Sequence, residues 1–79
     1  MALIDMVEES VRLLVNEPES VSVEEKDDRG TLVFFVTVAP NDVGRVIGKD
    51  GRVVSAIRQI VSAAGSKASK RTVVKINAD

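Results

Sequence analysis

The sequence predicts an α+β fold with the element order α-β-β-α-α-β, in which three helices cover one face of a three-stranded mixed sheet. Apolar residues recur at three- and four-residue steps in residues 2–15 and 52–64, a spacing that favours helices. Residues 31–39 and 72–76 are rich in β-branched residues, and residues 20–25 alternate valine with polar residues, as strands do. With 79 residues, the chain is expected to form a single domain, residues 1–79.

The first predicted element is a helix over residues 2–15. Its apolar side chains, Val7 and Val11 among them, lie on one stripe, as in a helix that packs against a core. Acidic residues lie early in the segment, where the helix dipole favours negative charge. Pro18 then closes the segment.

A β-hairpin is predicted next. Residues 20–25 alternate valine with polar residues, which is typical of a half-buried strand. Residues 26–30, KDDRG, have the composition of a turn. Residues 31–39 are β-branched and aromatic, which predicts a central strand buried on both faces. On such a strand Phe34 and Phe35 point to opposite faces, so we expect at least one in the core and leave the other for a partner contact.

Two helices and a last strand follow. Asp42 is in position to cap a short helix, residues 43–47. The helix over residues 52–64 is expected to stop at Gly65, before a basic loop and the strand 72–76. Because a strand, a helical crossover and another strand connect in the right-handed sense, we expect the last strand to pair parallel to the central one.

Charge divides the chain into two halves. Residues 1–42 carry ten acidic and three basic side chains, for a net charge of −7, whereas residues 43–79 carry eight basic and two acidic ones, for +6. This asymmetry suggests that the second half meets a polyanion. Two ordinary solvated surfaces of opposite sign would give the same pattern.

Composition excludes several classes of site. Cysteine and histidine are absent, so we expect no disulfide, no metal site and no cofactor, and no catalytic group is evident. Asp27 and Asp28 are interpreted as turn residues. No apolar run would span a membrane, and the acidic first ten residues are unlike a signal peptide, so a cytoplasmic protein is expected.

The segment Gly48-Lys49-Asp50-Gly51, here called the glycine loop, interrupts an otherwise helical pattern. Glycine permits a sharp turn and has no Cβ to hold a ligand away. Gly51 also lies at the start of the long helix, where free N–H groups point outward. With Lys49, Arg52 and Arg45 beside it, the loop is suited to hold one or two phosphates. A plain helix–turn–helix corner with glycines for steric reasons is the alternative.

Two other phosphate loops fit poorly. A nucleoside-triphosphate loop needs G-x-x-x-x-G-K-[ST], but Gly44 and Gly48 are one residue too close, and Asp50 replaces the hydroxyl residue. The dinucleotide pattern G-x-G-x-x-G fails because these two glycines are four residues apart.

The sequence VIGKDGRVVSAIRQIV, set within this element order, resembles the K-homology (KH) domain of the prokaryotic type II topology. The signature of that family is (V/I)-I-G-x-x-G between two helices. APNDVGRVIGKDGRVVSAIRQIVSAA, followed by SKRTVVKI, is especially similar to the small bacterial proteins of the KhpA group. The resemblance covers the whole chain.

This resemblance implies that the loop clamps the backbone of about four nucleotides of single-stranded RNA. The groove would lie between the helices flanking the loop and the strand 72–76, with residues 66–71 as its other wall. Lys75 would add long-range attraction. The implied RNA-binding residues are Gly48, Lys49, Asp50, Gly51, Arg52, Arg45, Arg58, Lys67, Lys70 and Arg71, with an apolar floor from Ile47, Val46, Val54 and Ile57.

The resemblance also implies an RNA chaperone or post-transcriptional regulator in the bacterial cytoplasm. It implies self-association to a homodimer, and a complex with a larger KH-containing protein, KhpB, linked to cell shape. Two other functions stay open: a protein-interaction module whose loop is incidental, and, ranked last, an enzyme acting on phosphate esters. The sequence does not distinguish RNA from single-stranded DNA.

Overall fold

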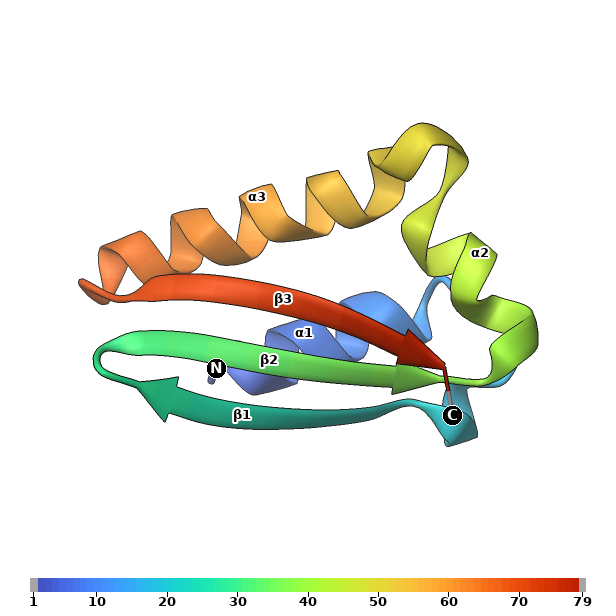
Figure 1. Cartoon of the computed structure of the whole chain (residues 1–79), viewed down its shortest axis with the longest axis horizontal. Helices are drawn as coiled ribbons and strands as arrows, with labels where there is room; N and C mark the ends of the chain where they lie inside the picture. The colour runs from blue at the N-terminus through green and yellow to red at the C-terminus, as the bar shows by residue number, and fades with distance from the viewer. Residues whose placement is uncertain (1, 79) are drawn as a thin grey trace.

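The structure is a computed structural model that describes residues 2–78 and has the predicted element order (Figure 1). Short 3₁₀ turns connect several elements, including one at Lys49–Gly51. The helices and strands are α1 (Leu3–Arg12), β1 (Ser22–Asp28), β2 (Thr31–Val38), α2 (Val43–Ile47), α3 (Arg52–Lys67) and β3 (Arg71–Ala78).

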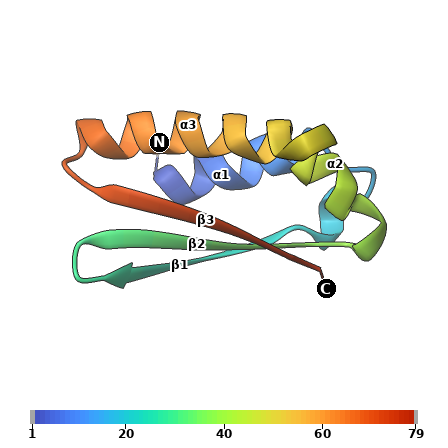
Figure 2. The ribbon, with the colours of Figure 1, turned by 45° about the horizontal axis from the view of Figure 1, so that its top comes forward.

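The sheet has the strand order β1-β2-β3. β1 and β2 pair antiparallel, with Asp28 opposite Thr31, and β2 and β3 pair parallel, with Thr31 opposite Arg71. The central position of β2 and the parallel crossover are thus confirmed. Figure 2 shows α1 and α3 side by side over one face of the sheet, with α2 at its end.

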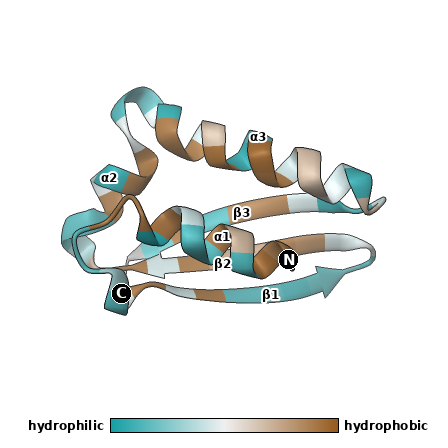
Figure 3. Ribbon diagram, turned by 180° about the vertical axis from the view of Figure 1, so that it is seen from behind, coloured by the Kyte–Doolittle hydropathy of each residue, from teal (hydrophilic) through white to brown (hydrophobic). Residues whose placement is uncertain are grey.

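The core lies between that face and the helices. Phe34, Val36 and Val38 of β2 are fully buried, and they meet Val7 and Val11 of α1, which are also fully buried. Figure 3 shows hydrophobic stretches on the strands behind α1 and a largely hydrophilic β1. Each buried valine or phenylalanine contributes roughly 1.5–3 kcal/mol. The buried apolar stripe predicted for both long helices is thus confirmed, although α1 ends at Arg12, three residues before its predicted end.

The expectation that β2 is buried on both faces was wrong. Burial alternates along the strand, and Phe35 is only half-buried while Phe34 is inaccessible. All the α-helices in residues 2–78 lie on the Phe34 side, so the other face of the sheet has no helical cover. The apolar composition of residues 31–39 therefore led to a prediction of more burial than the strand has, because helices cover only one of its faces.

Gly65 does not stop the long helix, which continues to Lys67. Gly65 is buried, and a Cβ placed on it would lie 2.6 Å from Thr72 Cγ2 and 3.1 Å from the Lys70 carbonyl oxygen. The glycine therefore lets the end of α3 pack closely against the start of β3. No helix in the described part of the chain is long and apolar enough to cross a membrane.

Candidate nucleic-acid interface

The glycine loop forms the corner between α2 and α3. Gly48 ends α2 with φ 77° and ψ 174°, and Asp50 and Gly51 follow with φ 57° and 73°. Gly48 N–H donates to the Gly44 carbonyl oxygen at 2.8 Å, and Gly51 N–H donates to the Gly48 carbonyl oxygen at 3.2 Å. Three left-handed residues within four positions explain why the helical pattern breaks here and resumes at once.

The two glycines of the loop have different roles. A Cβ on Gly48 would lie 2.4 Å from Val53 Cγ2 and 2.9 Å from the Val53 backbone nitrogen, whereas a Cβ on Gly51 would meet nothing within 4 Å. Gly48 is therefore required for both its dihedral angles and its close packing. Gly51 is required for its positive φ, and it leaves open space at the start of α3.

The charged side chains of the loop are exposed. Lys49, Asp50 and Arg52 all lie at the surface. The ion pairs found among residues 2–78 involve neither Lys49 nor Arg52, so both cations are available to an anion. No side chain among those residues caps the N-terminus of α3, where Gly51 is the N-cap. The corner thus combines free cations with uncapped N–H groups.

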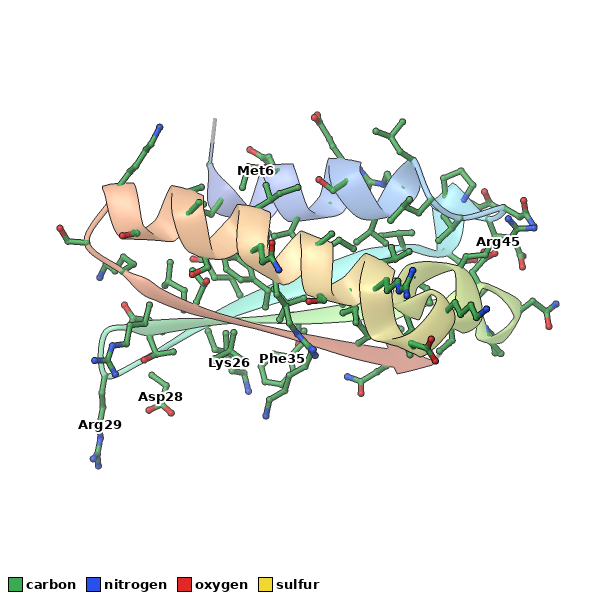
Figure 4. All side chains as sticks on the ribbon, turned by 90° about the horizontal axis from the view of Figure 1, so that it is seen from above. Met6, Lys26, Asp28, Arg29, Phe35 and Arg45 are labelled. Carbon is green, nitrogen blue, oxygen red and sulfur yellow. The ribbon has the colours of Figure 1, made fainter. Side chains whose placement is uncertain are left out.

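Arg45 is engaged by the protein itself. Its Nε lies 3.8 Å from Asp42 Oδ1. When the Asn16 amide is oriented with its oxygen toward Arg45, which satisfies both side chains, that oxygen accepts from Nε and Nη2 at 3.1 Å. Asp42 does not cap α2 as predicted, because its buried carboxylate accepts from the N–H groups of Asn16 and Glu17 at 3.1 and 3.0 Å. Arg45, labelled in Figure 4, therefore serves this tie between α2 and the segment after α1.

A groove of about 450 Å³ runs between α3 and β3. Arg58 crosses it, because its Nε and Nη2 donate to the Val74 carbonyl oxygen at 3.3 and 3.2 Å. β3 is an edge strand, so its outer backbone groups face this groove rather than another strand. The groove is lined by Arg58, Ser62, Thr72, Val73, Val74 and Lys75.

The four apolar residues expected at the floor of the groove differ in exposure. Val46 is fully buried, and Val54 and Ile57 are 6% and 5% exposed, so these side chains belong mainly to the core. Ile47 is 36% exposed and remains accessible. The main apolar side chain of the groove that sequence reasoning missed is Val73, which is 39% exposed. The alternation along β3 was the signal that could have separated it from its buried neighbour Val74.

The basic loop after α3 lies at the opposite end of that helix from the glycine loop (Figure 1). Lys67, Lys70 and Arg71 are all exposed there. Lys70 Nζ lies 3.7 Å from Asp27 Oδ2, so it is shared with the β1–β2 hairpin. The predicted basic residues are therefore distributed along the length of α3 and are not gathered at one point.

The chain is similar to known RNA-binding proteins over most of its length. The family model for the KH domain of KhpA and KhpB matches residues 4–76. The chain belongs to this KhpA/KhpB family. The RNA-binding protein KhpA of Clostridium perfringens is 42% identical over 72 residues, covering 91% of this chain and 96% of the relative. KhpA of Aquifex aeolicus is 41% identical over 75 residues, 95% of either chain.

Two solved structures contain a region with the fold of this chain. Era from Aquifex aeolicus bound to GDP and aluminium fluoride, and Era in complex with MgGDPNP and nucleotides 1506–1542 of 16S ribosomal RNA, each superpose with a TM-score of 0.63. Each match covers 96% of this chain and 29% of Era, at 20% identity. The type II KH fold itself follows from the family match and the element order. The described residues hold no cluster of acidic side chains that could bind a metal ion.

Proposed function

We propose that this KhpA-like KH domain binds single-stranded RNA, with the glycine loop holding the backbone of about four nucleotides. The observation that carries the proposal is the exposed left-handed corner at Gly48–Gly51, with Lys49 and Arg52 free beside it. The relatives in Clostridium perfringens and Aquifex aeolicus are named RNA-binding proteins, which supports the same function here.

In this proposal the glycine loop contacts the phosphates of the RNA. Gly51 lacks a Cβ and has open space around it, so a phosphate can approach the backbone N–H groups at the start of α3. Lys49 and Arg52 neutralise its charge. Asp50 is exposed in the same loop and repels phosphate, so we propose that one isolated domain binds weakly.

The bases then lie in the groove between α3 and β3. Val73 and Ile47 offer accessible apolar surface, and the outer edge of β3 offers backbone hydrogen-bonding groups. Arg58 donates two hydrogen bonds to the Val74 carbonyl oxygen, and we propose that its remaining N–H groups hydrogen-bond a base. The groove needs no aromatic stacking, and none of its lining residues is aromatic.

We further propose a non-enzymatic RNA chaperone or post-transcriptional regulator that works in the bacterial cytoplasm. A weak clamp gains from pairing, because two clamps on one RNA raise the effective concentration. Self-association, or a complex with a larger KH protein such as KhpB, would supply the second clamp. Ile60 on α3 is 57% exposed and Leu13 after α1 is 87% exposed, which supports an apolar contact with a partner.

These exposed apolar side chains also favour the second candidate, a protein-interaction module whose loop is incidental. The two readings differ in what the loop does. If RNA affinity is independent of the loop while self-association persists, the interaction module is the better description.

The deciding experiment is a titration of fluorescently labelled single-stranded RNA, followed by anisotropy. Lys49→Asp places a second carboxylate beside Asp50, and we expect the affinity to fall at least tenfold, since one attraction is lost and one repulsion gained. For the wild type, log affinity should fall with log salt at a slope of about −1.5 to −3, as for roughly two to four phosphate contacts.

Arg29→Asp is the matched control. It makes the same charge reversal at the exposed β1–β2 turn, away from the glycine loop, and should change affinity less than twofold. Equal losses for the two variants would show that only net charge matters. An unchanged affinity of the Lys49 variant would reject the clamp.

A further inference from the structure

We propose that the open face of the sheet carries a second RNA contact, in which a base beyond those in the groove stacks on Phe35 and Lys26 and Lys75 bind the adjoining phosphates. The open face is the side of β1–β3 turned away from α1 and α3. This inference rests on the proposed function, because it extends the path of the same RNA strand. It predicts a longer binding site than the four nucleotides of the clamp.

Phe35 is the aromatic ring of this chain that is not fully buried. The chain has two aromatic residues, both phenylalanine, and Phe34 is fully buried. Phe35 is half-buried and points away from the helices, beside Lys26 (Figure 4). An aromatic ring is sequence-tolerant as a stacking surface, since every base has a π-face.

Two ammonium groups flank this ring. Lys26 Nζ lies 5.7 Å and Lys75 Nζ lies 5.8 Å from the ring centroid of Phe35. Both lysines are exposed, and cation–π attraction is weak at exposed sites, so a phosphate can draw the ammonium groups away from the ring. The ring face is then available to a base whose own phosphates the lysines hold.

The open face is continuous with the groove. Val73 and Lys75 line the groove, and the register places them beside Val33 and Phe35 of β2 on the open face. β3 is the edge strand, and neighbouring strands lie about 4.8 Å apart, so Phe35 is one strand spacing from the groove. An RNA that leaves the groove over β3 therefore reaches Lys75 first and Phe35 next.

The charges on this face favour a nucleotide over an acidic protein surface. Glu24 lies opposite Phe35 and Asp28 lies near the hairpin turn, so the face as a whole has mixed charge. An acidic partner protein that covered the whole face would be repelled by the carboxylates of Glu24 and Asp28. One base with its flanking phosphates needs only the ring and the two ammonium groups.

The test compares single-stranded RNA of randomised sequence in two lengths, four and about ten nucleotides. Phe35→Leu keeps an apolar side chain but removes the stacking face. We expect it to weaken binding of the longer RNA about fivefold and of the shorter RNA less than twofold. Lys26→Met, which does not touch the groove, should reduce the salt slope for the longer RNA by about 0.7. Ser22→Ala, an exposed change at the start of β1, serves as the control and should change neither affinity.

A second measurement does not depend on a loss of binding. Because the chain contains no tryptophan, Phe35→Trp introduces a single fluorophore at the proposed contact. Stacking of a base should quench its emission when the longer RNA binds and leave it nearly unchanged with the shorter RNA.

Four results would overturn the inference. One is equal weakening of both RNA lengths by Phe35→Leu. Another is a change in the sedimentation state of the Phe35→Leu variant with unaltered affinity for the longer RNA, which would assign the face to a protein. The third is wild-type protein that binds neither RNA, in which case the proposed function fails as well. Binding of the short RNA with no effect of Phe35 on the long RNA removes only the second contact.

Discussion

Two of the corners that bend through left-handed backbone, the β1–β2 turn and the glycine loop, differ in their hydrogen bonds. The β1–β2 turn uses Arg29 and Gly30, with φ of 55° and 90°. There Asp27 Oδ1 accepts from the Gly30 N–H at 2.9 Å, while Asp27 Oδ2 lies 3.7 Å from Lys70 Nζ. The glycine loop between α2 and α3 has three left-handed residues, and no side chain in residues 2–78 caps the helix that follows it.

The difference separates a structural corner from one suited to a ligand. Both turns need glycine for their backbone angles, so glycine content alone does not distinguish them. The hairpin turn is closed by its own carboxylate and an adjacent lysine, which leaves little for a ligand to satisfy. At the glycine loop no side chain among residues 2–78 caps the first N–H groups of α3, and the cations Lys49 and Arg52 are exposed, which is the arrangement an anion requires.

The largest effect expected from this comparison is on folding stability. Gly48→Ala places a Cβ against Val53 at a backbone angle that essentially only glycine adopts, and should cost about 3 kcal/mol of unfolding free energy. Gly30→Ala meets nothing within 4 Å and should cost about 1 kcal/mol, from its positive φ alone. Urea denaturation followed by circular dichroism measures both.

Equal losses for these two glycine variants would contradict the packing argument. In a domain this small, a loss of about 3 kcal/mol is a large part of the total stability, so the Gly48 variant should be studied at low temperature. Gly51→Ala gives an internal check, because it has the strained φ and open space of Gly30 but lies in the same loop as Gly48.

An intermediate effect is expected at the hairpin. Asp27→Ala removes the acceptor of the Gly30 N–H and the partner of Lys70, and should lower stability by about 1 kcal/mol. RNA affinity should stay the same or rise up to twofold, because Lys70, one of the implied RNA-binding residues, loses its carboxylate partner. A clear loss of RNA affinity, in a protein shown by circular dichroism to be folded, would mean that the hairpin takes part in binding. Asp28→Ala, one residue on, is the control.

The element order, the strand pairing and the glycine loop were predictable because each depends on local sequence. Apolar period, turn residues and the handedness of crossovers determine them. The partners of polar side chains were not predictable. Asp42 looked like a helix cap, yet it binds the N–H groups of Asn16 and Glu17, which are more than twenty positions away.

Burial was harder to predict than element type because it also depends on distant parts of the chain. Phe34 and Phe35 are the same residue type and adjacent in sequence, and only the placement of the helices decides which of them is covered. At the proposed site, the free cations of the loop were identifiable from sequence. The engagement of Arg45 by Asn16, and of Arg58 by the Val74 carbonyl oxygen, depends on tertiary contacts, whereas Asp42 is only three positions from Arg45.

The smallest expected effect concerns Asp50, the acidic residue of the glycine loop. Asparagine tolerates the left-handed angle of 57° nearly as well as aspartate, so Asp50→Asn should leave stability unchanged while removing a charge that repels phosphate. RNA affinity should rise about threefold at low salt, and the gain should shrink as salt is added, because the repulsion is screened. Anisotropy titrations at two salt concentrations measure this.

Asp27→Asn, the matched control, makes the same change at the hairpin turn and should not increase RNA affinity threefold. If Asp50→Asn weakens binding instead, the carboxylate accepts a hydrogen bond from the RNA, and the loop selects its ligand as well as holding it.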